Sequence, residues 1–318
     1  MFDGARVLVT GAAGLVGSHL IERLVQQGAS VRAAYHHRRP SELPEVEYRS
    51  GIDLTDRAAC DAIVEGMDYA FFCAASTSGA AAITSTPLVH VTPNIIMNSQ
   101  LLEAAYLARL KKVMYLSSTT GYPVTGRPYK EEMMFQGDPF EKYFPAGWMK
   151  RYTEVLCRMY SERLDPPMPA LVLRPTSIYG PRDKFDPGRS HVLPALVRKV
   201  VERQDPIEVW GTGDDIRDCV YIDDVIDAML LAFERQTSYD PLNVGLGQSY
   251  SVKEVLQIIL EQDGYSAAQV RFDPTKPSTV PKQVVDCSKA ERVIGFKAKI
   301  GLVEGIRRTI EWYRASLK

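Results

Sequence analysis

Three regularly spaced glycines are the residues of this sequence that point most directly to a chemistry. The segment VLVTGAAGLVGSHL places Gly11, Gly14 and Gly17 between a short β-branched run and an amphipathic stretch. Between a strand and a helix, such glycines allow a tight turn, the close approach of a pyrophosphate, and packing of the helix on the sheet. Free N–H groups at the start of the helix attract the phosphate charge. The pattern predicts a dinucleotide site made of Gly11, Ala13, Gly14, Leu15, Val16 and Gly17.

That site needs a strand before the glycines and a helix after them, and the N-terminal half contains a series of such pairs. Strands are predicted at 6–10, 30–35, 68–74, 112–118 and 170–175, and helices at 14–27, 56–65, about 92–109 and 146–163. Strands separated by helices of this length form parallel βαβ units. We therefore expect an α/β fold with a doubly wound parallel sheet of the Rossmann type.

The sequence after residue 175 mixes short strand patterns with helix patterns and is too fragmentary for a second doubly wound sheet. Helices are predicted there near 191–203, 223–235, 251–262 and 302–317. We expect residues 1–175 to form an NAD(P)-binding Rossmann domain and residues 176–318 a smaller mixed α/β C-terminal substrate lobe. Segments near 218–245 are expected to return to the Rossmann domain.

The end of the second predicted strand bears on the choice between NAD and NADP. An acidic residue about 20 positions past the glycines would bond the ribose 2′-hydroxyl, whereas arginine would suit a 2′-phosphate. The segment here reads Tyr35-His36-His37-Arg38-Arg39, with no acidic residue. A solvated basic loop would have the same composition. Because an arginine–phosphate contact is strong, the sequence favours NADP over NAD, with Arg38 as the phosphate contact.

Composition excludes several other classes of function. The 38 Lys and Arg residues balance 39 Asp and Glu residues, for a net charge of -1, which leaves no broad basic surface for nucleic acids or membranes. No apolar run reaches the ~20 residues of a membrane span, and the N-terminus does not resemble a signal peptide. The five cysteines and five histidines form no CxxC, HExxH or similar ligand set, which predicts neither disulfides nor a metal site. We expect a cytoplasmic protein that acts on small molecules.

The string TGxxGxxG, in place of the GxGxxG of many dehydrogenases, resembles the extended short-chain dehydrogenase/reductase superfamily. Asp53-Leu54 in GIDLTD and Ala74-Ala75 in FFCAAS carry the same resemblance. It implies that Asp53 and Leu54 lie against the adenine. It also implies that the backbone of Ala74, Ala75 and Ser76 passes the cofactor ribose.

The resemblance also implies a catalytic serine and a YxxxK pair. Ser118 in YLSSTTGYP matches the serine and Lys150 in GWMKRYTE matches the lysine, but Ala146 stands at the tyrosine position. Reduction of a sugar ketone needs an acid beside the carbonyl oxygen, and a tyrosine with a lysine ammonium nearby is suited to that role. A methyl group cannot donate a proton. Lys150 would still hold the nicotinamide ribose.

Four explanations of Ala146 remain open at this point. The chain can carry a Tyr→Ala change in an otherwise ordinary enzyme, or it can be a natural homologue with redirected chemistry. Another hydroxyl, from Tyr143, Tyr122 or Thr120, can replace the missing one. Finally, the protein can bind its ligands without converting them.

The second half narrows the resemblance to the GDP-L-fucose synthase family, through SIYGPRDKFDPGRSHV, EVWGTGDDIRDCVYIDDV and DPTKPSTVPKQVVD. In that family the histidine of the SHV triplet is an epimerisation acid, which is His191 here, and its partner cysteine is replaced by Thr120. Arg217 matches a diphosphate-binding arginine, and Trp210 a substrate-contacting tryptophan. A salt bridge for Arg217 and a structural role for His191 stay open as alternatives. The predicted substrate contacts are Asn94, Ser118, Ser177, His191, Lys199, Trp210 and Arg217, and Pro175 is added to the cofactor contacts.

We therefore expect an NADP(H)-dependent sugar-nucleotide epimerase/reductase that acts on a keto-deoxy sugar, with GDP as the expected nucleotide. Its turnover is expected to be weak or redirected because Ala146 and Thr120 replace the usual acids. The alternatives are a 4-epimerase, 4,6-dehydratase or 4-dehydrogenase with tightly bound NAD, and a non-catalytic NADP-binding module. The resemblance also implies a homodimer formed through the helices at 92–109 and 146–163.

Overall fold

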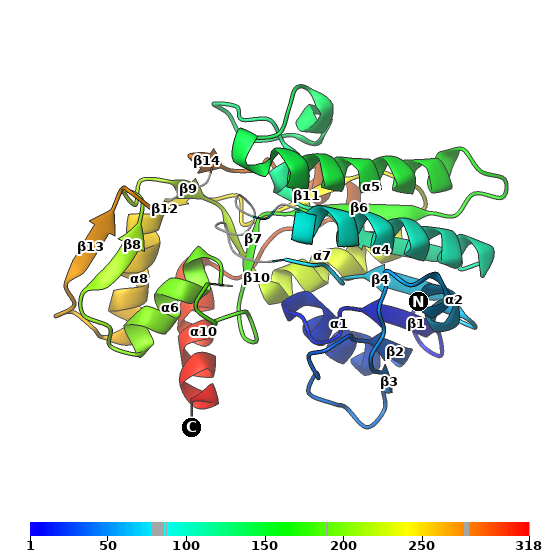
Figure 1. Cartoon of the computed structure of the whole chain (residues 1–318), viewed down its shortest axis with the longest axis horizontal. Coiled ribbons are helices and arrows are strands. Elements are labelled where there is room, and N and C mark those ends of the chain that lie inside the picture. Colours follow the sequence, from blue (N-terminus) through cyan, green and yellow to red (C-terminus); the bar gives the residue numbers. More distant parts are fainter. Residues whose placement is uncertain (78–85, 87, 189, 277–279, 318) are drawn as a thin grey trace.

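A seven-stranded parallel sheet forms the centre of the larger part of the molecule in the computed structural model (Figure 1). The structure describes residues 1–77, 86, 88–188, 190–276 and 280–317. The sheet has the order β11-β6-β5-β4-β1-β2-β3, and every neighbouring pair is parallel. Its strands are β1 (Arg6–Thr10), β2 (Ser30–Ala34), β3 (Glu47–Arg49), β4 (Tyr69–Phe72), β5 (Lys112–Leu116), β6 (Ala170–Pro175) and β11 (Leu242–Val244).

Helices cover both faces of this sheet. One face carries α1 (Leu15–Gln26) and α7 (Ile222–Arg235), which pack on each other, and the other carries α2 (Arg57–Val64), α4 (Leu88–Leu107) and α5 (Phe144–Glu162). Alternation along β1 shows why both faces are apolar: Val7 and Val9 belong to the core cluster under α1, whereas Leu8 belongs to the cluster under α4. A strand buried on both faces is typical of parallel sheets. The predicted doubly wound α/β fold is confirmed.

The C-terminal part adds a smaller group of helices and short strands. Three helices, α6 (Val192–Val201), α8 (Val252–Asp263) and α10 (Leu302–Ser316), pack against one another beside the parallel pair β8 (Ile207–Trp210) and β13 (Val270–Asp273). Figure 1 shows this group at one end of the molecule, away from α2. The remaining elements are β7 (Ser177–Tyr179), β9 (Ile216–Arg217), β10 (Cys219–Tyr221), β12 (Tyr250–Ser251), β14 (Lys282–Gln283), α9 (Ser288–Ile294) and the 3-10 turns η1 (Thr119–Gly121), η2 (Glu131–Phe135) and η3 (Glu141–Tyr143).

Strand order fixes where a ligand can bind. The chain passes from β1 to β2 on one side and later to β4 on the other, so β1 and β4 are neighbours whose following segments diverge. In doubly wound sheets this divergence leaves a crevice at the carboxyl ends of the strands. The glycine-rich loop, which follows β1, lies at that point.

Candidate active site

The glycine-rich loop is held by contacts that only glycine permits. Gly11 has a φ of +71°, and a Cβ there would lie 2.7 Å from the backbone nitrogen of Ala74. At Gly17 a Cβ would lie 2.3 Å from the carbonyl oxygen of Gly11. The first glycine therefore makes the turn and allows contact with the end of β4, and the third packs α1 against the loop, as the sequence pattern predicts.

The middle glycine leaves an open face, which suits a pyrophosphate. Among the described residues, a Cβ at Gly14 would meet only the carbonyl oxygen of Gly11 within 4 Å, at 3.2 Å. Gly14 is the N-cap of α1, no side chain caps the helix, and its first turn contains no acidic residue. The first-turn N–H groups of Leu15 and Val16 have no intrahelical carbonyl to bond. The residues present therefore fit a dinucleotide, with phosphate charge placed at the positive end of the helix.

The segment after β2 provides the adenosine end of the candidate site. His36 and His37 stack with ring centroids 3.6 Å apart, and both interact electrostatically with the Asp53 carboxylate. Hydrogen bonds from Thr55 lower the pKa of the Asp53 carboxyl. Of the two arginines, Arg39 pairs with Glu42 at 3.0 Å, whereas Arg38 is exposed. Leu54 is buried beside Asp53.

The segment after β4 is fixed by the first turns of α4. Asn94 is 3% exposed; its amide accepts from the Ser76 N–H at 3.1 Å and donates to the Ser76 carbonyl at 2.9 Å. The amide also donates to the carbonyl of His90, whose ring contacts the Ser76 carbonyl. These bonds place the backbone of Ala74 and Ala75 beside Gly11. The structure thus uses the Asn94 side chain to position a loop, whereas the sequence predicts a direct substrate contact.

Ser118 and Thr120 follow β5 and lie at the first turn of α5. The Ser118 hydroxyl accepts from the Thr120 N–H at 3.2 Å, and Ser118 is half-buried. A Cβ at Gly147 would come within 2.8 Å of the Thr120 carbonyl oxygen. This glycine therefore lets α5 approach the Ser118–Thr120 segment closely. Ala146 directly precedes Gly147 in the first turn of α5.

Lys150 lies one helical turn after Ala146, so both residues lie on one face of α5. Its ammonium donates to the carbonyl of Leu116 at 3.0 Å and lies 4.9 Å from the centre of the Tyr115 ring. Burial lowers the pKa of Lys150 to about 8, although Glu154 acts to raise it. Lys150 and the first turn of α5 therefore lie at the carboxyl end of β5, where Ser118 and Thr120 follow the strand.

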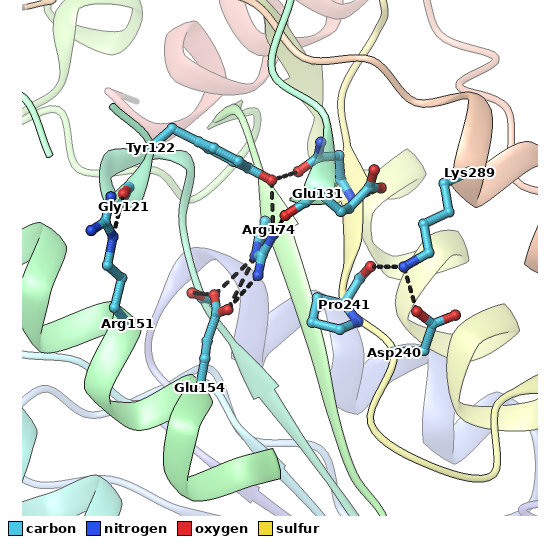
Figure 2. Close-up of polar contacts among 11 residues, drawn as sticks. Gly121, Tyr122, Glu131, Arg151, Glu154, Arg174, Asp240, Pro241 and Lys289 are labelled. Carbon is cyan, nitrogen blue, oxygen red and sulfur yellow. Dashed lines mark hydrogen bonds and ion pairs between the residues drawn. The ribbon is translucent and has the colours of Figure 1, made fainter. Parts of the chain in front are cut away.

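Behind this loop lies a buried polar network (Figure 2). Arg174 and Glu154 are paired at 2.6 Å with side chains 2% and 0% exposed. Glu154 also accepts from the Ser117 hydroxyl at 2.5 Å, and Arg174 also donates to the Tyr122 hydroxyl at 2.9 Å. The Tyr122 hydroxyl in turn donates to the Asn243 side chain at 2.7 Å. Together these bonds hold the segment on both sides of Ser118 to β6, β11 and α5.

The same contacts bear on which hydroxyl could stand in for the missing tyrosine. Tyr122 is 2% exposed and its hydroxyl is used in the network. Burial raises its pKa. The Tyr122 hydroxyl is therefore turned away from the reacting face. Tyr143 ends η3 just before α5, as the sequence predicts, and Thr120 stays adjacent to Ser118.

The C-terminal lobe places three predicted substrate residues at its edge. His191 is exposed at the N-cap of α6 and makes no capping bond with its side chain, so its imidazole is not used as a helix cap. Desolvation of the ring by neighbouring protein atoms, and then the positive charge of Lys184, lower the pKa of His191. Trp210 ends β8 with 46% of its surface exposed. Lys199 donates to the carbonyl of Glu208 at 2.5 Å and is partly buried.

Arg217 has the salt bridge that the sequence left open. Its guanidinium lies 3.1 Å from the carboxylate of Asp215 and donates to the carbonyl of Val280 at 2.5 Å. Ser177 begins β7, and its N–H donates to the carbonyl of Asp218 at 3.3 Å. Pro175 ends β6, the neighbour of β5 in the sheet. These residues therefore lie on β9, β7 and the end of β6, and their contact with a ligand stays a prediction.

Sequence reasoning missed the polar network as a unit. Glu154 could be noticed because it lies four residues after Lys150, but nothing in the sequence joins it to Arg174 or Asn243. It also missed Asp183 and Lys184, which lie on the loop after β7. Charged residues in a turn-rich segment are normally solvated, so the residue types alone did not indicate a functional role.

Within the described ranges no group of histidine, cysteine and carboxylate side chains could hold a metal ion. In the same part of the chain, no helix is long and apolar enough to cross a membrane.

A dinucleotide-binding loop, a buried lysine and a serine at the carboxyl edge of a doubly wound sheet together define an NAD(P)-dependent enzyme. The model of the NAD dependent epimerase/dehydratase family matches residues 7–245, and the chain belongs to this family. By this membership it is a sugar-nucleotide enzyme of the epimerase/reductase class.

Individual relatives agree with this family. GDP-L-fucose synthase of Escherichia coli is 29% identical, over 97% of this chain and 96% of that protein. A dTDP-4-dehydro-6-deoxy-D-allose reductase of Streptomyces is also 29% identical, over 98% and 97%. Among solved structures, UDP-glucose 4-epimerase of Thermotoga maritima with UDP-glucose has a TM-score of 0.88 and 26% identity, over 98% of this chain and all of that one.

Proposed function

We propose that this protein is an NADP(H)-dependent epimerase/reductase for a keto-deoxy sugar nucleotide, with GDP as the nucleotide, and that its turnover is impaired as the sequence stands. The observation that carries the proposal is the packing of α5 against the Ser118 segment. This packing supports a reacting face made of Lys150, Ser118 and position 146. The similarity to GDP-L-fucose synthase and to a 4-keto-sugar reductase supports the substrate class.

Each residue of this face has a separate task. The first turn of α1 and the Gly14 backbone would hold the cofactor pyrophosphate, and Lys150 would hold the nicotinamide ribose. When bound, the dinucleotide supplies a hydride. Ser118 would orient the substrate carbonyl oxygen by donating a hydrogen bond, and His191 would exchange a proton with the sugar or bind it.

The proposed site lacks the side chain that would donate a proton to the carbonyl oxygen of the substrate. Ala146 carries no donor, and the Tyr122 hydroxyl is bound within the network. Lys150 remains an ammonium at neutral pH, but its contact is the Leu116 carbonyl. Substrate and cofactor binding are therefore expected to persist while the chemical step is slow.

The direct test measures binding and turnover on the same sample. Calorimetry with NADPH and with a GDP-4-keto-6-deoxyhexose should show binding of both, while NADPH consumption stays near the uncatalysed rate. Conversion at normal enzymatic rates would contradict the impairment. Failure to bind any dinucleotide would contradict the function itself.

A 4-epimerase with tightly held NAD is the second candidate, and the similarity to UDP-glucose 4-epimerase over the whole chain favours it. Such an enzyme reduces its bound cofactor transiently and returns it to the oxidised form in each cycle. Mass spectrometry of the nucleotide released on denaturation separates the two candidates. The epimerase would be favoured if the released nucleotide is NAD, and not if it is NADP or if no nucleotide is released.

We also propose a homodimer formed through α4 and α5. Along α5, four large side chains at Phe144, Trp148, Tyr152 and Val155 are each more than 40% exposed. Their spacing follows one helical face, and α5 packs beside α4, which exposes Leu107. Light scattering at micromolar concentration should give twice the monomer mass, and Val155→Glu should shift the protein toward monomer. A wild-type monomer at that concentration would contradict the dimer.

A further inference from the structure

The loop that follows β7 connects the C-terminal half to both sides of the glycine-rich loop. Arg182 forms an ion pair with Glu22 of α1 at 2.6 Å. Two residues later, Lys184 donates to the Thr77 hydroxyl at 2.8 Å, beyond the end of β4. Because α1 and the segment after β4 flank the candidate cofactor site, residues 182–184 lie across its edge. Arg182 has a φ of +66°, which an arginine adopts only where its surroundings hold it.

Asp183 lies between these two anchors with a carboxylate oxygen that has no partner. The residue is 7% exposed, and its Oδ1 accepts from the Lys184 N–H at 2.7 Å. Its Oδ2 is fully buried and has no hydrogen-bond donor among the described residues. A buried carboxylate oxygen without a donor is costly and rare in folded proteins, so it calls for an explanation.

The charges around Asp183 show which end of the site it faces. Burial of the Asp183 carboxyl has the largest effect on its pKa and raises it to about 7. The positive charges of Lys184 and Arg38 have the opposite, smaller effect. Arg38 belongs to the segment after β2, at the adenosine end. The end of β2 has no acidic residue, whereas Asp183 is an acidic residue from another part of the chain whose carboxylate interacts electrostatically with Arg38.

We propose that Asp183 is a residue that determines cofactor specificity. Its free carboxylate oxygen accepts a hydrogen bond from the 2′-hydroxyl of the adenosine ribose of NAD(H), and its negative charge opposes the 2′-phosphate of NADP(H) that Arg38 attracts. The proposal rests on the cofactor site of the proposed function. It makes the choice between the two dinucleotides a balance between Arg38 and Asp183.

This balance predicts a selectivity that changes with pH. Protonation of Asp183 removes the charge that opposes the phosphate, so NADPH should be favoured at low pH and NADH at high pH. The neighbouring groups are the Arg182–Glu22 pair on α1, Lys184, and the adenosine-end side chains His36, His37, Arg38 and Asp53. Protonated histidines would act in the same direction, so the contribution of Asp183 must be isolated by substitution.

The experiment measures dissociation constants for NADH and NADPH by fluorescence titration between pH 6 and 8.5. In the unmodified protein the ratio of the NADPH to the NADH constant should rise about tenfold or more over this range, the effect of one hydrogen bond to a charged group. Asp183→Asn should flatten the ratio and favour NADPH, and Asp183→Glu should keep the pH dependence. Asp186→Asn, an exposed acid of the same loop, is the matched control and should change nothing.

The outcomes separate this inference from the proposed function. If Asp183→Asn keeps the ratio and pH dependence of the unmodified protein, the inference is wrong. A pH dependence that survives in Asp183→Asn but disappears in His36→Asn or His37→Asn also overturns it. If neither dinucleotide binds the unmodified protein, the proposed function fails instead. Thermal melting of each variant, with Asp183→Glu as the second variant, shows whether a loss of binding is a loss of folding.

Discussion

Replacing Ala146 by tyrosine is the substitution that tests the reacting face most directly. Gly147 lets α5 approach the Thr120 carbonyl so closely that a Cβ would lie 2.8 Å from it. Position 146 lies in the same turn of α5 as Gly147, and Lys150 follows one turn later on the same face. A phenol placed there gains a nearby ammonium, which lowers a tyrosine pKa by roughly 1–3 units from its ordinary value near 10. The hydroxyl then becomes a proton donor suited to neutral pH.

A positioned general acid contributes about 10²–10⁴-fold to the rate. Ala146→Tyr should therefore raise turnover of a GDP-4-keto-6-deoxyhexose with NADPH by that factor, with little change in NADPH affinity. Ala146→Phe is the matched control, because it adds the same ring without the hydroxyl and should leave turnover low. Stopped-flow measurement of NADPH consumption gives the chemical step. Equal rates for the two variants, both folded and both binding NADPH, would refute the reasoning and favour redirected chemistry or a non-catalytic module.

Three further substitutions test the supports of the site. Glu154→Ala should lower the free energy of unfolding by about 3–5 kcal/mol in urea titrations, because it leaves the Arg174 charge buried and unpaired, whereas an exposed Glu162→Ala on the same helix should cost little. Lys150→Met should raise the free energy of unfolding at pH 7 by at most about 3 kcal/mol, because the lowered pKa of Lys150 means that burial opposes its charge. This stabilisation should fade as the pH rises above 8. A stabilisation that does not depend on pH would contradict this account. Gly17→Ala should abolish dinucleotide binding, because its Cβ would lie 2.3 Å from the Gly11 carbonyl oxygen, and an unchanged NADPH affinity would show that the loop can shift.

The fold could be predicted from the sequence wherever local patterns decide the structure. The predicted helix at 146–163 is α5 at Phe144–Glu162, and the predicted strand at 170–175 is β6. Both follow from periodicity and from a buried run flanked by turn residues. Strand order in the N-terminal half then follows from short βαβ connections. The predictions for the C-terminal half placed helices well but could not pair its short strands, since β8 meets β13 across a long separation in the chain.

Residues of the candidate site could be predicted only where a single sequence motif contains them. The glycine-rich loop is such a motif, and its geometry agrees with the role of each glycine. The use of Asn94 could not be foreseen, because its amide is bound by the loop after β4, which the sequence does not place beside α4. Asp183 is the sharpest case. Arg38, from the segment after β2, is one of the charges that act on its carboxylate, and nothing in the sequence indicates that the loop after β7 comes near that segment.

Under the proposed function, the surroundings of Lys150 favour a change to a working site over the decay of an unused one as the origin of Ala146. A buried ammonium whose pKa is lowered to about 8 destabilises the fold at neutral pH. The paired charges of Arg174 and Glu154 lie directly behind it, and breaking such a pair is costly whereas an apolar replacement of both is often neutral. Neither feature is needed for the parallel sheet. Both are expected if they hold Ser118 and the cofactor ribose in place. For the reduction step the proposed binding and orienting groups are then present, and the missing proton donor is the one at position 146. A site in this state should regain its chemistry through one side chain, which is what the comparison of Ala146→Tyr with Ala146→Phe measures.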